Sequence, residues 1–502
     1  MKHRTLILTM LCIALPAVAQ RDAFEQFRRQ QTTDFSSFRD AQQEQYDLFR
    51  AQANARYADF MRKAWSDFPV NAPDIPEEEE MVEPVLYEEP EITTAATTVQ
   101  TPTGKYVFRE ISIDPTIVVV PTPTPSPEPL APVKPKPGVS ETVQTGYYGC
   151  TMQLDYPRPD NLKLVGLTED ALADAWTLLA GKAYDITVRT ALTGRERNAL
   201  CDWAYMDALR TNTEAHYGAS NEAVLMQAYL MTQSGYRIRL AKAGDRLYML
   251  VASKYQIYNM RYLKVEGVKY YVTGEYKGEK LQLCPAAFDK EQSLSMQLAE
   301  LPKAPDNPTP KRKLTSKKGV TASVSVNRNL IDFFSRYPQA NIDGDFTTRW
   351  AAYANTPLDT AIQEQLYPVL QQTVSRMDEY AAVGILLNWV QTAFQYGYDD
   401  KIWGGDRAFF SQETLYYPQS DCEDRSILFT RLVRDILGLD AALLYYPGHL
   451  AAAVAFRNTQ QGDWFIAKGR RYTVCDPTYI NAPVGMTMPG MEDKTPKVII
   501  LR

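Results

Sequence analysis

Three residues in the last quarter of the chain have the types and the order of a thiol nucleophile, its base and an orienting carboxylate. Cys422 lies in Ser-Asp-Cys-Glu-Asp-Arg-Ser, and His449 and Asp476 follow it at two equal intervals along the chain. Histidine is the usual side chain that takes a proton from a thiol near neutral pH, and the chain contains 3 histidines. If the protein is an enzyme, we expect these three residues to carry its chemistry.

A helix is expected to begin at Cys422. The residues that follow carry apolar side chains at helical spacing: Ile427, Leu428, Leu432, Val433, Ile436 and Leu437. The N-terminus of a helix exposes unsatisfied N–H groups, which favour a thiolate and can bind a developing oxyanion. The backbone N–H of Cys422 is therefore one expected oxyanion donor, and Gln412, Gln419 and Trp403 are the candidates for a second.

Strand patterns place the other two residues of the predicted triad. Gly438 ends the helix, and a strand then leads to Gly448 and His449. Asp476 comes at the end of a further strand. Because successive strand residues point to opposite faces, an Asp476 directed at His449 sends Cys475 the other way. Cys475 is therefore predicted to be structural and not the nucleophile.

The motifs around the triad form a set. They are Glu413-Thr-Leu ahead of the cysteine, Asp421-Cys422-Glu423-Asp424 opening a helix, Gly438-Leu439 entering a strand, Gly448-His449 on the next strand and Asp476-Pro477-Thr478 on the third. Because of these motifs, residues 365–485 resemble the transglutaminase-like superfamily. In that superfamily a papain-type thiol site is built on a Cys-helix-strand-His-strand-Asp core. The chain departs from that pattern in having Ser420 where many relatives have glycine. It also has Leu450 and three alanines after the histidine in place of an aromatic residue.

The resemblance implies an acyl-transfer mechanism on a protein or peptide substrate. Cys422 would attack a glutamine carboxamide or a peptide carbonyl, His449 would protonate the departing amine, and Asp476 would orient the imidazole. Water or an amine would then resolve the thioester. Because bacterial relatives often hydrolyse, the resemblance favours a cysteine peptidase or amidase over a cross-linking acyltransferase.

Residues 1–19 have the pattern of a secretory signal peptide. A basic start is followed by an apolar run over residues 6–16 and by Ala17-Val18-Ala19, with cleavage expected after Ala19. We therefore expect a protein of the bacterial periplasm or cell surface, with no transmembrane segment, since no later stretch approaches the roughly 18 apolar residues that one needs. The net charge of -6 argues against nucleic acid as the main partner.

Residues 20–70 are predicted to form a long amphipathic helix. Aromatic residues repeat every 11 positions, at Phe24/Phe27, Phe35/Phe38, Tyr46/Phe49, Tyr57/Phe60 and Phe68. Eleven residues make three turns, so these side chains form one stripe along the helix. A single helix cannot bury such a stripe, which leaves three partners open: a second copy in a coiled coil, an envelope partner, or the protein's own globular part.

The remaining boundaries follow from composition. Residues 71–144 are acidic and proline-rich, which predicts a solvated, stiff linker that holds the helix and the body apart or joins them loosely. Residues 145–302 are predicted to form an α+β domain, 303–318 a second linker, and 319–502 the transglutaminase-like domain. Leucines, glycines and alanines of the two domains match at one constant offset, as in Leu225 with Leu428 and Gly235 with Gly438. The first domain could thus be a degenerate copy, with Ala219 for Cys422, Arg246 for His449, and Thr273 or Gly274 for Asp476.

Two functions follow, and the sequence favours the first. One is an exported thiol enzyme that hydrolyses peptide or amide bonds; the alternative is a non-catalytic cell-envelope binding or assembly protein that uses the fold as a scaffold. A redox role for Cys422 and Cys475 is disfavoured because there is no Cys-x-x-Cys spacing. We expect no cofactor and no metal, because the histidines are not clustered with paired cysteines and there is no glycine-rich phosphate loop. Five cysteines remain after cleavage, so at least one is expected to be unpaired.

Overall fold

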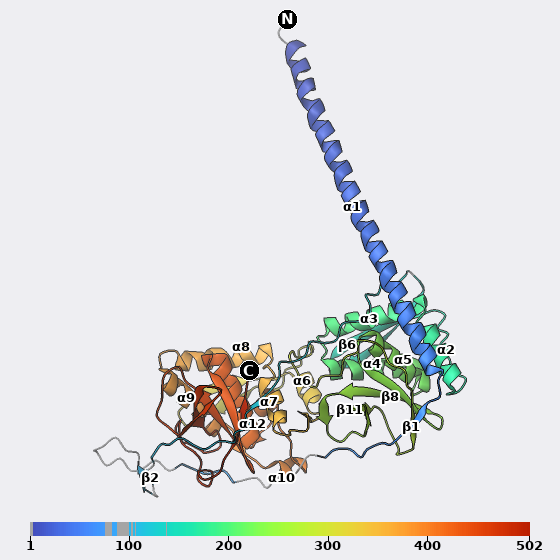
Figure 1. The fold of residues 1–502 in the computed structure, drawn as a ribbon. Helices are drawn as coiled ribbons and strands as arrows, with labels where there is room; N and C mark the ends of the chain where they lie inside the picture. The colour runs from blue at the N-terminus through green and yellow to red at the C-terminus, as the bar shows by residue number, and fades with distance from the viewer. Residues whose placement is uncertain (1–3, 76–82, 88–99, 102–103, 106, 137) are drawn as a thin grey trace.

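Two α+β halves and one long helix make up the protein (Figure 1). The computed structural model describes residues 4–75, 83–87, 100–101, 104–105, 107–136 and 138–502. The α+β class and the long N-terminal helix are confirmed. Within these residues, no helix is both long enough and apolar enough to cross a membrane.

The first half is a sheet with strand order β1-β12-β7-β8-β11-β10, packed against helices. Four helices precede the main strands of this half: α2 (Glu169–Leu179), α3 (Asp185–Arg197), α4 (Asp202–Tyr217) and α5 (Asn221–Gln233), with a 3-10 turn at Lys182–Tyr184. The strands are β1 (Ser66–Phe68), β7 (Ile238–Ala243), β8 (Arg246–Ser253), β10 (Tyr262–Val265), β11 (Val268–Val272) and β12 (Leu281–Leu283). A separate hairpin, β5 (Ser140–Tyr147) and β6 (Cys150–Pro157), packs on α3 and α4.

The second half is built around a sheet with strand order β20-β21-β19-β18-β22-β4. Its strands are β4 (Val118–Val119), β18 (Asp440–Tyr446), β19 (His449–Ala455), β20 (Trp464–Ala467), β21 (Arg470–Cys475) and β22 (Lys497–Ile500). The helices are α6 (Arg328–Phe334), α7 (Thr348–Asn355), α8 (Thr360–Val374), α9 (Glu379–Ala393), α10 (Asp399–Trp403), α11 (Ser411–Tyr416) and α12 (Cys422–Leu432), which continues as a π-helical turn at Val433–Leu437. Short paired strands complete the chain: β2 (Gln100–Thr101) with β3 (Gly104–Lys105), β9 (Tyr255–Ile257) with β15 (Ala340–Ile342), β13 (Arg312–Thr315) with β14 (Thr321–Val324), and β16 (Gln395–Tyr396) with β17 (Gln419–Ser420).

The two sheets share one strand order and one hairpin register. The order β12-β7-β8-β11-β10 of the first half corresponds to β22-β18-β19-β21-β20 of the second. In the β7–β8 hairpin Ala243 is paired with Arg246, and in the β18–β19 hairpin Tyr446 is paired with His449. The offset between the hairpins, 446 − 243 or 449 − 246, equals the offset of 428 − 225 found in the sequence. In each half a helix, α5 or α12, precedes this hairpin and packs on it.

Helix α1 (Arg4–Met61) leaves the first half and projects far beyond it (Figure 1). Its C-terminal part is docked: Tyr57 is buried and stacks on Trp176 and Phe288, with ring centroids 4.4 and 4.5 Å apart. Further along, the same stripe is exposed, by 62% at Phe35, 60% at Phe38, 39% at Tyr46 and 52% at Phe49. The helix ends earlier than the predicted residue 70, and Phe68 lies in strand β1 instead.

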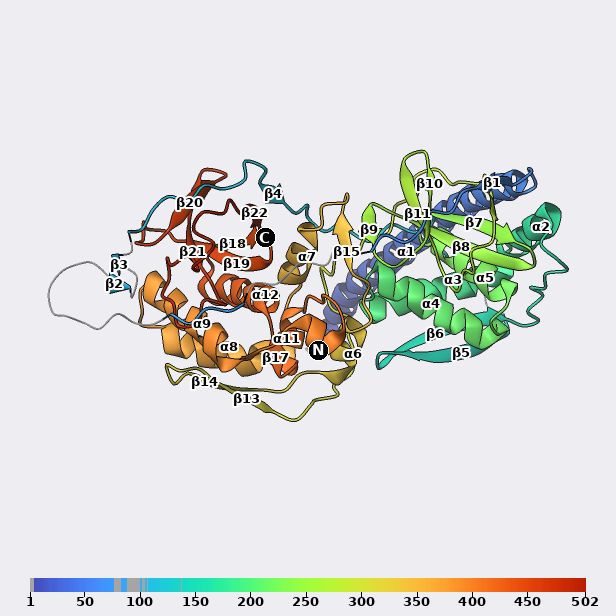
Figure 2. The ribbon, with the colours of Figure 1, turned by 90° about the horizontal axis from the view of Figure 1, so that it is seen from below.

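The segment predicted to be a loose spacer lies against both halves. Strand β4 pairs in parallel with β22 (Figure 2), and Glu110 forms an isolated parallel bridge with Trp464. The proline-rich part contacts the first half, where Gln292 Nε2 donates to the carbonyl of Pro125 at 2.8 Å. Four apolar residues of the segment are buried against the two halves: Val118, Val120, Ala131 and Val133. The prediction of a solvated spacer was wrong for these residues because composition does not reveal a few well-placed apolar side chains; the acidic run at 77–80 lies outside the described residues.

Candidate active site

The N-terminus of α12 holds the predicted nucleophile. Asp421 is the N-cap, with Oδ1 accepting from the backbone N–H of Asp424 at 3.4 Å. In turn, Oδ2 of Asp424 accepts a hydrogen bond from the backbone N–H of Asp421 at 3.2 Å. These reciprocal hydrogen bonds form a capping box, which fixes Cys422 as the first residue of the helix, as predicted.

The thiol of Cys422 lies against the strand that carries the histidine. Its Sγ accepts a hydrogen bond from the backbone N–H of Leu450, at 3.5 Å, and the side chain is 1% exposed. Leu450 follows His449 at the start of β19. Helix α12 packs on β19, where Ala452 belongs to the same apolar cluster as Leu428 and Leu432 of the helix. Ala451 and Ala453 belong to a different cluster, because successive strand residues point to opposite faces.

His449 and Asp476 form a buried hydrogen-bonded pair. His449 Nε2 lies 2.8 Å from Asp476 Oδ2, and both residues are buried. The second oxygen of Asp476, Oδ1, accepts from the backbone N–H groups of Thr478 and Tyr479, at 2.8 and 3.1 Å. Nδ1 of His449 has no hydrogen-bond partner among the described residues. The carboxylate thus orients the ring, and the nitrogen left available to act as a base is Nδ1.

The structure places the three predicted site residues in one constellation. Cys422 and Asp476 are both linked by hydrogen bonds to the His449–Leu450 segment. Cys475 packs in a separate apolar cluster with Ala452, Val454 and residues of α9, as strand parity predicts. All five cysteines from Cys150 onward are free, so neither a structural disulfide nor a Cys422–Cys475 bridge is present among them.

The corresponding positions of the first half lack these groups. Arg246 occupies the register position of His449, and Ala219 precedes α5 as Cys422 begins α12. On the third strand Val251 pairs with Tyr271 whereas Val454 pairs with Thr473, so Gly274 corresponds to Asp476. The first half therefore has neither nucleophile, base nor orienting carboxylate at these positions.

Tyr396 is a polar neighbour of the thiol that the sequence did not single out. In the β16–β17 pair it lies opposite Ser420, two residues before Cys422. Burial, followed by the charges of Cys422 and Asp421, raises the pKa of Tyr396. Its hydroxyl has no hydrogen-bond partner in the described part of the chain. Among the described residues, none of the three oxyanion candidates named above forms a hydrogen bond to Cys422.

The surroundings of Cys422 oppose its ionisation. Burial, and then the charges of Asp421 and Glu423, raise the pKa of the Cys422 thiol well above its ordinary value. The N–H of Leu450 acts in the opposite direction but does not reverse the effect. The expectation that the helix N-terminus favours the thiolate was therefore wrong in this conformation, because desolvation and two adjacent carboxylates outweigh a helix dipole.

Acidic side chains gather around this helix start. One carboxylate oxygen from each of Asp399, Asp421 and Glu423 lies within 4.8 Å of the others, and all three residues are buried. Burial and mutual repulsion raise the pKa of each of these carboxyl groups. In the described part of the chain this is the one group of three or more such ligands close enough to hold a metal ion. The sequence shows the two carboxylates beside Cys422 but not Asp399, which tertiary structure adds.

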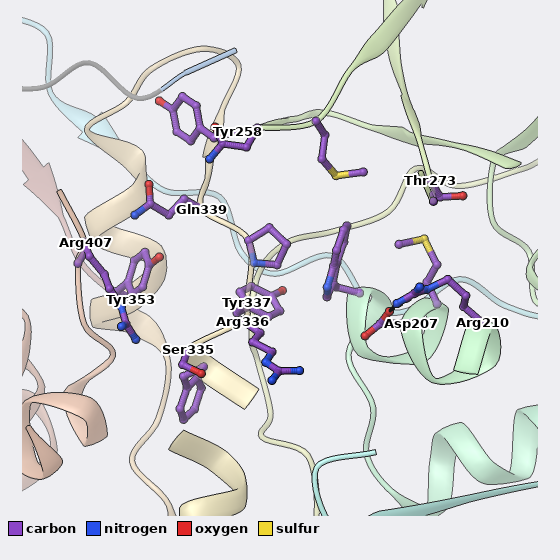
Figure 3. Close-up of a pocket in the computed structure, with 18 of the residues that line it drawn as sticks. Asp207, Arg210, Tyr258, Thr273, Ser335, Arg336, Tyr337, Gln339, Tyr353 and Arg407 are labelled. Carbon is purple, nitrogen blue, oxygen red and sulfur yellow. Dashed lines mark hydrogen bonds and ion pairs between the residues drawn. The ribbon is translucent and has the colours of Figure 1, made fainter. Parts of the chain in front are cut away.

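A cavity of about 550 Å³ lies between the two halves (Figure 3). Asp207 and Arg210 of α4 line it from the first half, and Arg336, Tyr353 and Arg407 from the second. The triad residues do not line this cavity. Through Arg407 the cavity wall is connected to the acidic group near Cys422, since the backbone N–H of Arg407 donates to Asp399 Oδ2 at 2.7 Å.

Comparison with known proteins assigns neither a family nor a function to the chain. No protein-family model matches the chain, no curated protein matches it, and no solved structure matches it.

Proposed function

We propose that the protein is a thiol acyl-transfer enzyme of transglutaminase-like type that hydrolyses peptide or amide bonds through Cys422, His449 and Asp476. The observation that carries the proposal is the assembled hydrogen-bond geometry. Asp476 holds Nε2 of His449 at 2.8 Å and leaves Nδ1 without a partner among the described residues, while the next residue's N–H contacts the thiol. Asp476 orients the ring of His449, and the thiol of Cys422 lies against the residue that follows this histidine, which supports the proposal.

In the proposed reaction Cys422 attacks the substrate carbonyl after its proton passes to His449 Nδ1. The amine then departs with that proton, and water resolves the thioester. The backbone N–H of Cys422 and the hydroxyl of Tyr396 are the proposed oxyanion donors. A hydrogen bond between Sγ and Nδ1 is not formed in this structure, and such contacts often tighten only when substrate is bound.

The test is a product analysis with matched cysteine variants. Chain lacking residues 1–19 is incubated with a peptide mixture, with and without hydroxylamine, and new termini and hydroxamates are identified by mass spectrometry. We expect both products from the wild-type protein and neither from Cys422→Ala. Cys475→Ala is the control, because Cys475 is equally buried but lies in another apolar cluster. Equal product from Cys422→Ala, or none from the wild-type chain, would refute the proposal.

A non-catalytic role in the cell envelope is the second candidate, and the burial of the Cys422 thiol, which raises its pKa, favours it. In that case function would lie in the projecting part of α1. We propose that this part pairs with the same helix of a second copy. Residues 28–49 carry three basic and four acidic side chains, so the net charge by which two copies repel each other is small: Arg28, Arg29, Asp34, Arg39, Asp40, Glu44 and Asp47. The 11-residue repeat lets the exposed aromatic stripes of two such helices align.

Light scattering tests the pairing of α1. The double variant Phe35→Ser/Phe38→Ser should be monomeric where the wild-type chain is dimeric or larger. Glu44→Gln is the control, because at about 100° per residue it lies on the opposite face of the helix. A wild-type chain that is monomeric at all accessible concentrations would exclude self-association and leave an envelope partner.

We further propose that the halves arose by duplication, and that the protein is exported after cleavage at Ala19. The common strand order and the common offset of the two hairpins support duplication. Export is supported by the signal-like residues 1–19, and N-terminal sequencing of the protein from its native host tests it.

A further inference from the structure

The cavity between the two halves has the size and the position of a small-molecule site. Its volume of about 550 Å³ lies within the range of about 300–1,000 Å³ that is usual for such sites, which often form between domains. Figure 3 shows Asp207, Arg210 and Thr273 on the side of the first half, and Tyr353 and Arg407 on the side of the second. A ligand in the cavity would therefore contact both halves.

Two polar side chains of the cavity wall are almost completely buried and have a hydrogen-bonding atom that the protein does not use. Gln227 of α5 is 3% exposed, and its Nε2 donates to the carbonyl of Met206 at 2.9 Å. Oε1 of Gln227 accepts no hydrogen bond from the described residues. Tyr353 of α7 is 6% exposed, and its hydroxyl has no hydrogen-bond partner in the described part of the chain. Since buried polar atoms normally have partners, these two atoms are available to a ligand.

The charges of the cavity wall favour an anion. Two of its three arginines are paired with carboxylates at 2.7 and 2.6 Å: Arg210 with Asp207, and Arg407 with Glu413. The third, Arg336, donates to the hydroxyl of Tyr148 and forms no ion pair among the described residues. A guanidinium can bind a carboxylate through two parallel hydrogen bonds, so Arg336 is the expected anchor of an anionic ligand.

The remaining wall is suited to an apolar group and an amide. Trp203, Met206, Met260 and Phe334 line the cavity, and they provide aromatic and thioether surface for an apolar side chain. Nε1 of Trp203 has no acceptor among the described residues. The cavity thus combines unused donors with one unused acceptor, Oε1 of Gln227. An amide group matches such a set, because it has both an N–H and a carbonyl.

We propose that this cavity binds an N-acylated amino acid, either free or as the C-terminal residue of a peptide. Its carboxylate would pair with Arg336, its amide N–H would donate to Oε1 of Gln227, and its amide carbonyl would accept from the hydroxyl of Tyr353. The apolar side chain would pack on Trp203 and Met260. A free amino acid fits less well, because its ammonium group would meet no unpaired carboxylate in the wall.

The proposed site is separate from the candidate active site. Cys422, His449 and Asp476 do not line the cavity, so the proposal does not rest on the proposed reaction. Because the ligand contacts residues of both halves, its binding would hold the halves in one relative position and raise the Tm of the protein.

Calorimetric titration with matched acids and carboxamides tests the site. The Cys422→Ala protein is used so that no probe is consumed. The probes are N-acetyl-leucine, N-acetyl-methionine and N-acetyl-phenylalanine, each compared with its carboxamide, which lacks the charge. We expect at least one acid to bind about tenfold or more tightly than its carboxamide. A glycyl-glycyl extension of that acid distinguishes the two sources: equal affinity indicates a peptide end, and weaker affinity a free N-acylated amino acid.

Variants of the cavity wall, made in the same protein, locate the binding. Arg336→Gln should weaken binding of the acid about tenfold or more and leave the affinity for the carboxamide unchanged. Tyr353→Phe should weaken both about three- to tenfold without lowering Tm, because the hydroxyl that it removes has no partner in the protein. The controls are Arg376→Gln, an exposed arginine, and Tyr229→Phe, a buried tyrosine whose hydroxyl also has no partner among the described residues. Neither lines the cavity, so both controls should keep the full affinity.

Two results would overturn the proposal. One is that no acid binds at concentrations up to about 10 mM, and the other is binding that Arg336→Gln and Tyr353→Phe leave unchanged. Binding is measured without product formation, so the cavity site and the proposed reaction can fail separately. A wild-type chain that forms product while no acid binds the Cys422→Ala protein would retain the enzyme and remove the cavity site. Binding without any product would do the reverse.

Discussion

Asp476→Asn is the most discriminating change in the candidate active site. In the wild-type protein Oδ1 of Asp476 accepts two backbone N–H groups, from Thr478 and Tyr479, and Oδ2 faces His449 Nε2. An asparagine must keep its single oxygen at the Oδ1 position, because an amide NH₂ there would face two donors. Its NH₂ group is then directed at Nε2, which must become an acceptor, and the imidazole proton moves to Nδ1.

We therefore expect Asp476→Asn to remove the general base while the free energy of unfolding changes little. With its proton on Nδ1, the ring cannot take the proton of Cys422, and a wrong tautomer in comparable triads costs about 10⁴ in kcat. Every hydrogen bond of the carboxylate retains a partner in the variant, so we expect a change in unfolding free energy below about 1 kcal/mol. Asp476→Ala should differ, since it leaves two N–H groups and Nε2 without partners and costs roughly 1–3 kcal/mol or more.

The assay combines product formation, Tm and the ¹⁵N spectrum of the histidine side chains. Beyond the signal-like segment the chain has two histidines, His216 and His449, so the ring signals can be assigned with one His216→Gln variant. We expect the proton of the His449 ring on Nε2 in the wild-type protein and on Nδ1 in Asp476→Asn. An Asp476→Asn protein with wild-type kcat, or with an unchanged tautomer, would refute this account of the site.

Three further predictions concern stability and reactivity. Arg50→Met should undock α1 or destabilise the protein by about 3–5 kcal/mol at pH 7, because it leaves Asp185 buried without its main partner; urea unfolding and limited proteolysis measure this. Burial raises the pKa of Asp185, so the loss should shrink as the pH falls through that raised pKa and the carboxyl becomes neutral. Alkylation of Cys422 by iodoacetamide in EDTA should be slow at pH 7 and rise about tenfold per pH unit past pH 9, and a plateau below pH 8 would contradict the raised thiol pKa. Gly462→Ala should lower Tm, because its Cβ would lie 2.3 Å from Cα of Gly485 and the φ of +135° suits only glycine; an unchanged Tm would show that the two loops can separate.

Local pattern was sufficient for much of the fold. Helical periodicity after Cys422 predicted α12, and strand alternation separated Cys475 from Asp476. The aromatic repeat predicted α1, although not the turn into β1 at residue 66. The constant offset between the two halves, weak in the sequence, corresponds to a common strand order and hairpin register. The helical periodicity and the strand alternation depend on residues a few positions apart, which is why these elements can be predicted from the sequence.

By itself, then, the sequence determined which three residues could do thiol chemistry and on which kinds of element they lie. Tertiary structure decided their environment: the burial of Cys422, the direction of its pKa shift, and the approach of Asp399 to Asp421 and Glu423. It also decided that the proline-rich segment packs on both halves. The physical reason is that burial and electrostatic interaction depend on distances between groups that are remote in sequence, and no local period records those distances.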